Sequence, residues 1–91
     1  LSESIMEFAS TFPAVYVSFD IDVIDPVYAP GTGNIAVGGF TSKEALYLVR
    51  RIKRLKNLRG FDLVEINPDK DINGITMKLG VEILYEVLNR E

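Results

Sequence analysis

The sequence predicts an α/β fold with parallel strands, in the order helix, strand, helix, strand, helix. A short run of β-branched and aromatic residues, apolar on both faces, extends from Val15 to Asp20 and is typical of a strand covered on both sides. Apolar residues then recur at helical spacing between Ala45 and Leu55. A second short run from Phe61 to Ile66, stopped by Asn67-Pro68, completes a strand–helix–strand unit, whose strands are expected to be parallel.

The first element is predicted to be a short helix that begins at Ser2 or Ser4 and extends to about Ser10. Glu7 follows Ser4 by three residues, as in a capping box, and Pro13 is expected to end the element.

The central helix is predicted to run from Thr41, which forms a second capping box with Glu44, to about Lys56, and Gly60 is expected to end this unit. Its opposite face is basic and comprises Arg50, Arg51, Lys53, Arg54, Lys56 and, just beyond, Arg59. The helix dipole favours cations near a helix C-terminus, and no aromatic residues interleave with them for base stacking. A solvated face is therefore favoured over a nucleic-acid site.

The last helix is predicted from Ile75 to Asn89, begun by Asn73-Gly74 and Thr76. Its buried stripe is expected to comprise Met77, Leu79 or Gly80, Ile83, Leu84, Val87 and Leu88, with the methionine as core filler rather than a ligand.

Two carboxylates stand at the C-terminal end of the first strand, at Asp20 and Asp22. Side chains alternate along a strand, so both are expected to point the same way and converge on one ion or on two adjacent ions. Carboxylate oxygens suit hard or borderline divalent metals. Aspartates also cap solvated turns, but the apolar surroundings favour a metal, because an isolated buried carboxylate is costly. Glu65 lies at the corresponding end of the second strand, so all three acids are expected to face one crevice.

The segment from Asp22 to Phe40 is long for a connection, which favours a functional loop. Its glycines at 31, 33, 38 and 39 permit a positive φ or a close backbone approach.

The amino-acid composition excludes several classes of function. The 91 residues make one small globular domain at most, with 47% hydrophobic residues and a net charge of −3 that gives no argument for a nucleic-acid partner. Cysteine is absent, which excludes disulfides and thiolate metal sites, and a reducing cytoplasm is the expected location. No apolar run approaches the ~20 residues of a membrane span. Histidine is also absent, so the chain offers no imidazole ligand or base.

Two motifs resemble the C-terminal signature of the arginase/agmatinase (ureohydrolase) family. The first is Ser18-x-Asp20-x-Asp22, followed by Pro26, Pro30-Gly31 and Gly39, and the second is Gly60-Phe61-Asp62-Leu63-Val64-Glu65-Ile66-Asn67-Pro68. Asp71 and Thr76 also stand where the family often has an acid and a helix-starting threonine. The resemblance covers nearly everything from Val15 onward.

The resemblance implies a fragment of a three-layer α/β/α fold, with residues 1–91 as the C-terminal part of a ureohydrolase domain whose N-terminal portion is absent. It implies that Asp20 and Asp22 ligate a binuclear Mn²⁺ centre and that Glu65 anchors a guanidinium group, which pairs bidentately with a carboxylate. In such enzymes a hydroxide bridging two metals attacks the guanidinium carbon and releases urea and an amine. No catalytic residue is assigned within this chain, which is expected to be inactive alone and, like its family, to form trimers or hexamers.

Agmatine, cleaved to putrescine and urea as in polyamine biosynthesis, is the first choice of substrate. The motif at residues 20–31, Asp-Ile-Asp-x-x-Asp-Pro-x-x-Ala-Pro-Gly, resembles the sequences of agmatinases more than those of arginases. Many agmatinase-like members continue with Thr-Pro-Glu-Pro-Gly-Gly after this point, whereas residues 34–39 read Asn-Ile-Ala-Val-Gly-Gly. Arginine, guanidinobutyrate and formiminoglutamate therefore stay open as substrates.

Other classes of protein also contain an Asp-x-Asp motif. A haloacid-dehalogenase-like phosphatase usually has Thr or Val where Ile24 stands, and neither a later Asp pair nor a phosphate-binding lysine is evident. A sugar-nucleotide transferase predicts none of the second motif. An EF-hand requires Glu where Gly31 occupies the twelfth position. The phosphatase and a non-catalytic α/β fragment are the alternatives kept.

Overall fold

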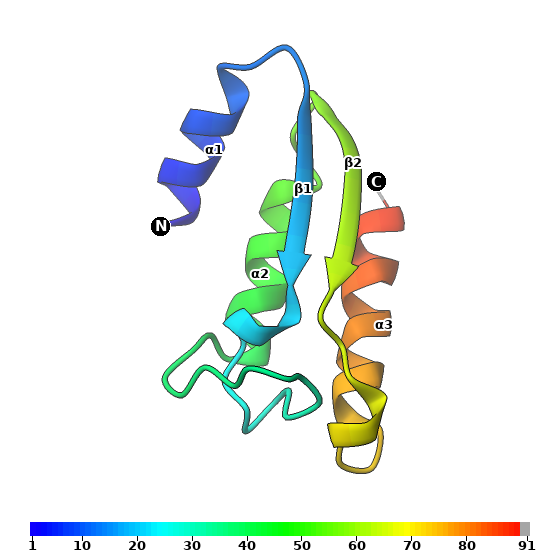
Figure 1. Cartoon of the computed structure of the whole chain (residues 1–91). Helices are drawn as coiled ribbons and strands as arrows, with labels where there is room; N and C mark the ends of the chain where they lie inside the picture. Colours follow the sequence, from blue (N-terminus) through cyan, green and yellow to red (C-terminus); the bar gives the residue numbers. More distant parts are fainter. Residues whose placement is uncertain (90–91) are drawn as a thin grey trace.

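The computed structural model describes residues 1–89, and its elements follow the predicted order (Figure 1). They are α1 (Ser2–Ser10), β1 (Val15–Asp20), α2 (Ser42–Ile52), β2 (Leu58–Val64) and α3 (Ile75–Leu88), with 3₁₀ turns at Ile21–Val23 and Pro68–Lys70. The predicted α/β class and the alternation of helices and strands are confirmed.

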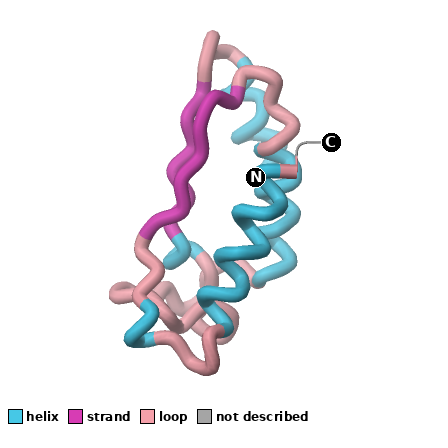
Figure 2. The backbone as a smooth tube through the Cα atoms, turned by 90° about the vertical axis from the view of Figure 1, so that its right-hand side faces the viewer, coloured by secondary structure: helices cyan, strands magenta, loops and turns pink. Residues whose placement is uncertain are grey.

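The two strands pair in parallel, in a register that runs from Tyr16 opposite Gly60 to Asp20 opposite Val64. Parallel pairing brings the C-terminal ends of both strands to the same edge of the sheet. The three helices all lie on one face of the sheet (Figure 2). On the other face Tyr16 is 64% exposed. Among residues 1–89 the sheet is therefore covered on one side only, whereas cover on both sides was predicted.

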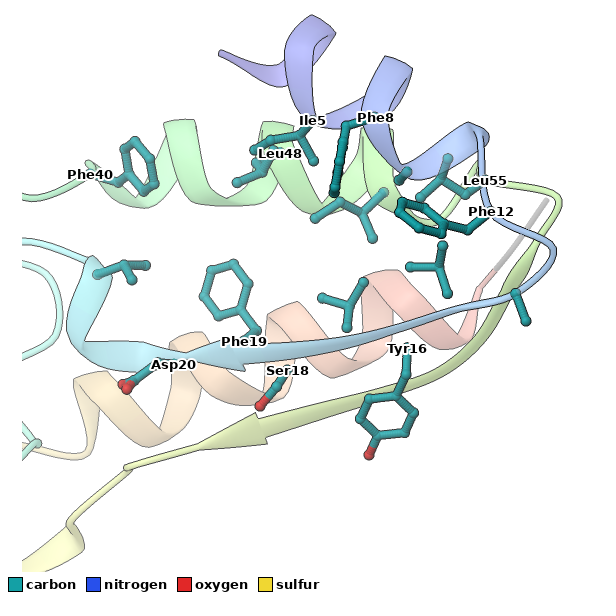
Figure 3. A pocket seen from close by; sticks show the side chains of 16 residues that line it. Ile5, Phe8, Phe12, Tyr16, Ser18, Phe19, Asp20, Phe40, Leu48 and Leu55 are labelled. Carbon is teal, nitrogen blue, oxygen red and sulfur yellow. The ribbon is translucent and has the colours of Figure 1, made fainter.

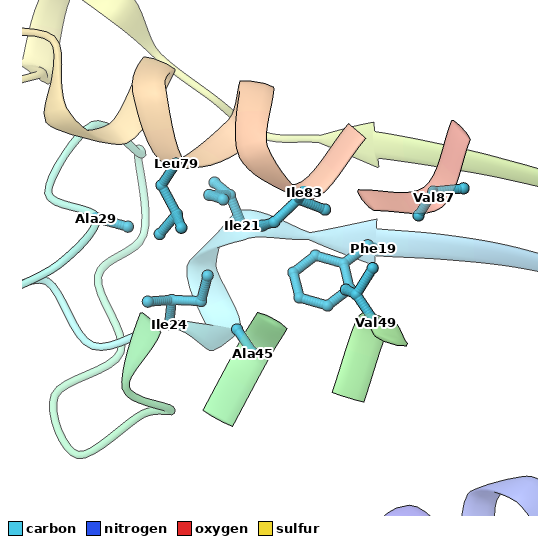
Figure 4. Packing of buried hydrophobic residues seen from close by; sticks show 9 residues of the cluster. All are labelled: Phe19, Ile21, Ile24, Ala29, Ala45, Val49, Leu79, Ile83 and Val87. Carbon is cyan, nitrogen blue, oxygen red and sulfur yellow. The ribbon is translucent and has the colours of Figure 1, made fainter. Parts of the chain in front are cut away.

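The main core lies between β1, α2 and α3 (Figure 4). Its fully buried side chains are Ile21, Ile24, Ala29, Ala45, Val49 and Ile83, with Phe19 at their centre. A smaller cluster of Ala9, Ile52, Leu55 and Leu58 attaches α1 to the end of α2.

The boundaries of α2 and β2 differ from the prediction because two leucines enter the smaller cluster. Leu55 and Leu58 are both buried beside Ile52, so the chain leaves the helix at Ile52 rather than Lys56 and begins the strand three residues early. Gly60 therefore lies inside β2, where the Tyr16 ring fills the place of a Cβ, which would stand 2.4 Å from a ring carbon.

The predicted capping box on α1 was wrong, because the helix begins at Ser2, so Ser4 lies inside it and no side chain caps its start. The capping box of Thr41 and Glu44 on α2 is confirmed, with bonds of 3.1 and 2.9 Å.

The basic face of α2 is less solvated than predicted. Lys53 is buried, and its ammonium donates to Glu86 and to the carbonyl of Asn89, while Arg50 pairs with the same glutamate at 3.0 Å. These charges join α2 to α3.

On α3 the buried residues are Thr76, Leu79, Gly80, Ile83 and Val87. Met77, Leu84 and Leu88, predicted to belong to the stripe, are exposed, so Met77 is no core filler here. The helix contacts the sheet and α2 through a narrow face, and the exposed residues lie outside it.

Candidate functional site

The two predicted metal-binding aspartates follow each other at the end of β1, but the reason given for their convergence was wrong. Asp20 ends the strand, whereas Asp22 lies in the 3₁₀ turn of Ile21–Val23. The turn places them together, because Asp20 Oδ1 accepts the Asp22 N–H at 3.0 Å. Ile21 and Ile24 are fully buried on either side of Asp22, which anchors the turn in the core. Their i, i+3 spacing was the signal for a helical turn in place of strand alternation.

Glu65 directly follows β2. It is next to Val64, the last residue of the strand, which pairs with Asp20. The register sets Asp20 opposite Val64, so the two acids leave neighbouring strand ends at one edge of the sheet. Glu65 has a φ of 73°, in the left-handed region, which costs a non-glycine residue about 1–2 kcal/mol. Such strain persists mainly where the surrounding structure and function require it.

Electrostatics also joins the three acids. Burial raises the pKa of the Asp22 carboxyl, and a hydrogen bond with the Asp20 side chain and the negative charges of Asp20 and Glu65 raise this pKa further. Carboxylates that crowd one place disfavour ionisation, and a bound cation would reverse that effect.

The chemistry of the donors fits a divalent cation in part. Asp20 and Asp22 offer the oxygen ligands that Mn²⁺ accepts. Within residues 1–89, however, no group of three or more Asp, Glu, His or Cys side chains is arranged to hold a metal ion. The two aspartates could therefore supply only part of a coordination sphere.

Asp25, which the sequence analysis did not single out, organises the loop beside these acids. Its Oδ1 accepts the N–H of Val27 and its Oδ2 that of Gly38, both at 2.9 Å. A Cβ on Gly39 would stand 2.5 Å from the Val23 carbonyl oxygen, so only glycine fits that close approach. The Asp-Pro pair at 25–26 was the available signal for such a turn.

A second cluster ties the two strands together on the face without helices. Asp62 accepts the Ser18 hydroxyl at 2.6 Å and the Tyr16 hydroxyl at 2.8 Å. The bond from Ser18 and then that from Tyr16 lower the pKa of Asp62. Figure 3 shows Tyr16, Ser18 and Asp20 projecting from one face of β1, while Phe19 points toward the helices. The cluster fixes the strand register just before the acids.

Asp71 caps the start of α3. It accepts the N–H groups of Ile72, Thr76 and Met77 at 2.9 to 3.0 Å. Burial acts to raise the pKa of Asp71, but these bonds and one from the Thr76 hydroxyl outweigh it and lower the pKa from 3.8 to about 2.

The lowered pKa of Asp71 predicts acid sensitivity. Its contribution to stability is fully present above its unfolded pKa of 3.8 and is lost as the pH falls through about 2. We expect the difference in melting temperature between wild type and Asp71→Asn to be constant from pH 7 to about pH 4 and to shrink toward pH 2. Calorimetry across this range measures it, with Asp69→Asn as the control, and a difference independent of pH would contradict the assignment.

A groove of about 570 Å³ lies between α1, β1 and α2, and Asp20 is one of its lining residues, whereas Asp22 and Glu65 are not. Apolar side chains line it, among them Phe8, Phe12, Phe19 and Leu48 (Figure 3). Its lining is mainly apolar, with Tyr16, Ser18 and Asp20 as the polar exceptions. No helix among residues 1–89 has the length and apolar character to cross a membrane.

Comparison with known proteins shows the family of this chain. The profile of the arginase family matches residues 1–89. The agmatinase of Proteus mirabilis is 43% identical over 88 residues, which are 97% of this chain and 28% of that protein. The guanidinopropionase of Pseudomonas aeruginosa is 48% identical over 73 residues, 80% of this chain and 23% of that protein.

The fold agrees as well. The crystal structure of arginase from Bacillus subtilis superposes with a TM-score of 0.91 at 29% identity, over 99% of this chain and 34% of that one. The chain spans 20 to 28% of the length of the curated relatives it matches. The predicted fragment of an α/β/α fold is confirmed, and the chain belongs to the arginase family.

Proposed function

We propose that this chain is the C-terminal part of a ureohydrolase domain that cleaves a guanidino substrate, with agmatine as the first candidate. The observation that supports the proposal is the position of Asp20, Asp22 and Glu65 at the C-terminal ends of two paired parallel strands, in a chain of the arginase family. The products from agmatine would be putrescine and urea, which gives the protein a place in polyamine biosynthesis.

Asp20 and Asp22 are the proposed ligands of Mn²⁺, two ions in the complete site. Asp20 Oδ1 is engaged by the Asp22 N–H, which fixes the carboxylate and leaves Oδ2 for the metal. When bound, Mn²⁺ would supply Lewis-acid activation of water. Because this chain has no histidine, further ligands and any imidazole base would come from residues beyond these 91.

Glu65 is the proposed guanidinium anchor. A carboxylate accepts two parallel N–H bonds from a planar guanidinium group, which would orient its central carbon toward the aspartates. Water then adds to that carbon, the C–N bond to the amine breaks, and the amine leaves with a proton as urea forms.

Two substitutions at Glu65 separate binding from backbone strain. We expect Glu65→Gln and Glu65→Gly both to weaken binding of a guanidino substrate, because both remove the carboxylate. Only glycine relieves the positive φ, so it is expected to raise the free energy of unfolding by up to about 1 kcal/mol, after the entropy cost of glycine. Urea denaturation and substrate titration measure the two effects. Equal stability of both variants would contradict the strain assignment.

The function is tested by grafting. The 91 residues replace the matching region of the Proteus mirabilis agmatinase, and urea release is measured with agmatine, arginine, guanidinobutyrate, guanidinopropionate and formiminoglutamate in the presence of Mn²⁺. We expect release from agmatine above the others. A folded graft that binds Mn²⁺ and releases no urea from any of them would refute the proposal, and preference for another substrate would correct it.

The isolated chain is expected to be inactive, because it supplies two proposed metal ligands and no histidine. Robust urea release by the purified 91-residue chain would contradict this. Both edges of its two-stranded sheet carry unpaired backbone groups, so self-association is also expected, and light scattering checks it. We also propose that the protein forms homo-oligomers and that it is located in the cytoplasm. The names of some relatives suggest mitochondria as the alternative location.

A further inference from the structure

Gly31 connects the two segments that follow the strands. Its N–H donates to Thr76 Oγ1 at 2.8 Å, and its carbonyl accepts the Asn67 N–H at 2.7 Å. Gly31 belongs to the loop that leaves Asp22, and Asn67 lies two residues after Glu65. The Gly31 carbonyl therefore joins the loop that follows the aspartates to the segment that carries Glu65, and the Gly31 N–H joins the same loop to α3.

The bond from Gly31 is built into the protein interior. Thr76 is fully buried, and its hydroxyl proton is directed to Asp71, which leaves the oxygen to accept the Gly31 N–H. Asp71 is in turn fixed by three backbone N–H groups of the α3 start. A Cβ at Gly31 would stand 3.0 Å from the Cβ atoms of both Asp71 and Thr76, so these neighbours would have to give way by a few tenths of an ångström.

We propose that Thr76 and Asp71 are positioning residues that, through Gly31, set the separation between the Asp20–Asp22 pair and Glu65. The importance of this separation for catalysis rests on the proposed function, in which a guanidinium group held by Glu65 must present its carbon to a cation held by the aspartates. An error of about 1 Å in such a separation costs on the order of 100-fold in rate. The structural part of the proposal stands on the hydrogen bonds alone.

Thr76→Val tests the structural part, because it keeps the shape of the side chain and removes the hydroxyl. In the ¹⁵N-labelled 91-residue chain, we expect hydrogen exchange at the Gly31 and Asn67 amides to accelerate about tenfold or more, as an unpaired buried N–H implies. Thr76→Ser keeps the hydroxyl and is expected to restore protection. Thr41→Val removes the capping hydroxyl of α2 and controls for general loss of stability.

Gly31→Ala provides a second route should the valine variant fold poorly. The added methyl group pushes Thr76 and Asp71 away, so exchange at the Asn67 amide is expected to accelerate as in Thr76→Val. Protection of Gly31 unchanged by Thr76→Val, or lost equally in Thr41→Val, would overturn the proposal.

Paramagnetic broadening tests the functional part without an activity assay. With MnCl₂ added, the amide signals of Asp22 and Glu65 are both expected to broaden in wild type, and Thr76→Val is expected to keep the first effect and reduce the second. A general loss of stability would reduce the broadening at both amides, so a reduction at Glu65 alone indicates a change of position. Identical broadening at Glu65 in both proteins would overturn the positioning role. Absence of broadening at Asp22 in wild type would show that the two aspartates alone do not hold Mn²⁺ and would overturn the functional part of the proposal for this chain, while amide exchange would still decide the link through Gly31.

Discussion

Replacing Asp20 or Asp22 by asparagine in the grafted agmatinase is expected to lower Mn²⁺ affinity and urea release by at least about 100-fold. Loss of a residue that only supports a metal ligand already costs about 10–100-fold, and a lost ligand costs more. The two side chains act together, since Asp20 accepts the Asp22 N–H and its negative charge raises the pKa of Asp22. The double variant is therefore expected to be little worse than either single one.

Electron paramagnetic resonance of unbound Mn²⁺ measures the affinity, and a colorimetric assay measures urea. Asp69→Asn is the matched control, because Asp69 is exposed and lies in the separate turn of Pro68–Lys70. Full activity in Asp20→Asn would remove this residue from the metal site, and equal losses in Asp69→Asn would point to a general charge effect.

Replacing Ile83 by alanine is expected to lower the free energy of unfolding by about 2–5 kcal/mol. Ile83 is fully buried where α3 meets Phe19 and Val49 in the main core (Figure 4). A chain of 91 residues has a total stability of about 5–14 kcal/mol, so this loss is a large share. Chemical denaturation monitored by circular dichroism measures it.

Leu84→Ala is the control for Ile83→Ala, because Leu84 is the next residue of the same helix and is 40% exposed. Its cost is expected to stay below about 1 kcal/mol. A loss equal to that of Ile83→Ala would mean that the outer side of α3 is covered in the protein as it exists in solution.

The α/β class and the order of the elements could be predicted from the sequence because apolar periodicity differs between helices and strands. β1 was predicted with its observed bounds, since Val15–Asp20 is bounded by Pro13 and by the turn. β2 was predicted with shifted ends, because Gly60 is a poor strand residue by propensity and is accepted here only through the Tyr16 ring across from it.

The geometry of the candidate site could be predicted only in part. The positions of Asp20, Asp22 and Glu65 at the strand ends follow from a parallel pair, which the sequence indicated. The turn that carries Asp22 and the positive φ of Glu65 depend on tertiary packing, as does the bond between Gly31 and Thr76, 45 residues apart. Local patterns carry little information on such contacts.

The parallel pairing of β1 and β2 also sets when the acidic edge can form. Ser18 and Asp62 are 44 residues apart in sequence, so the chain must close that whole span before their bond exists. Closing a long span costs entropy before any contact compensates for it, and folds dominated by distant contacts assemble slowly. A growing chain therefore carries both aspartates before Glu65 is added, and the edge proposed to bind a cation can form only after β2 has paired with β1.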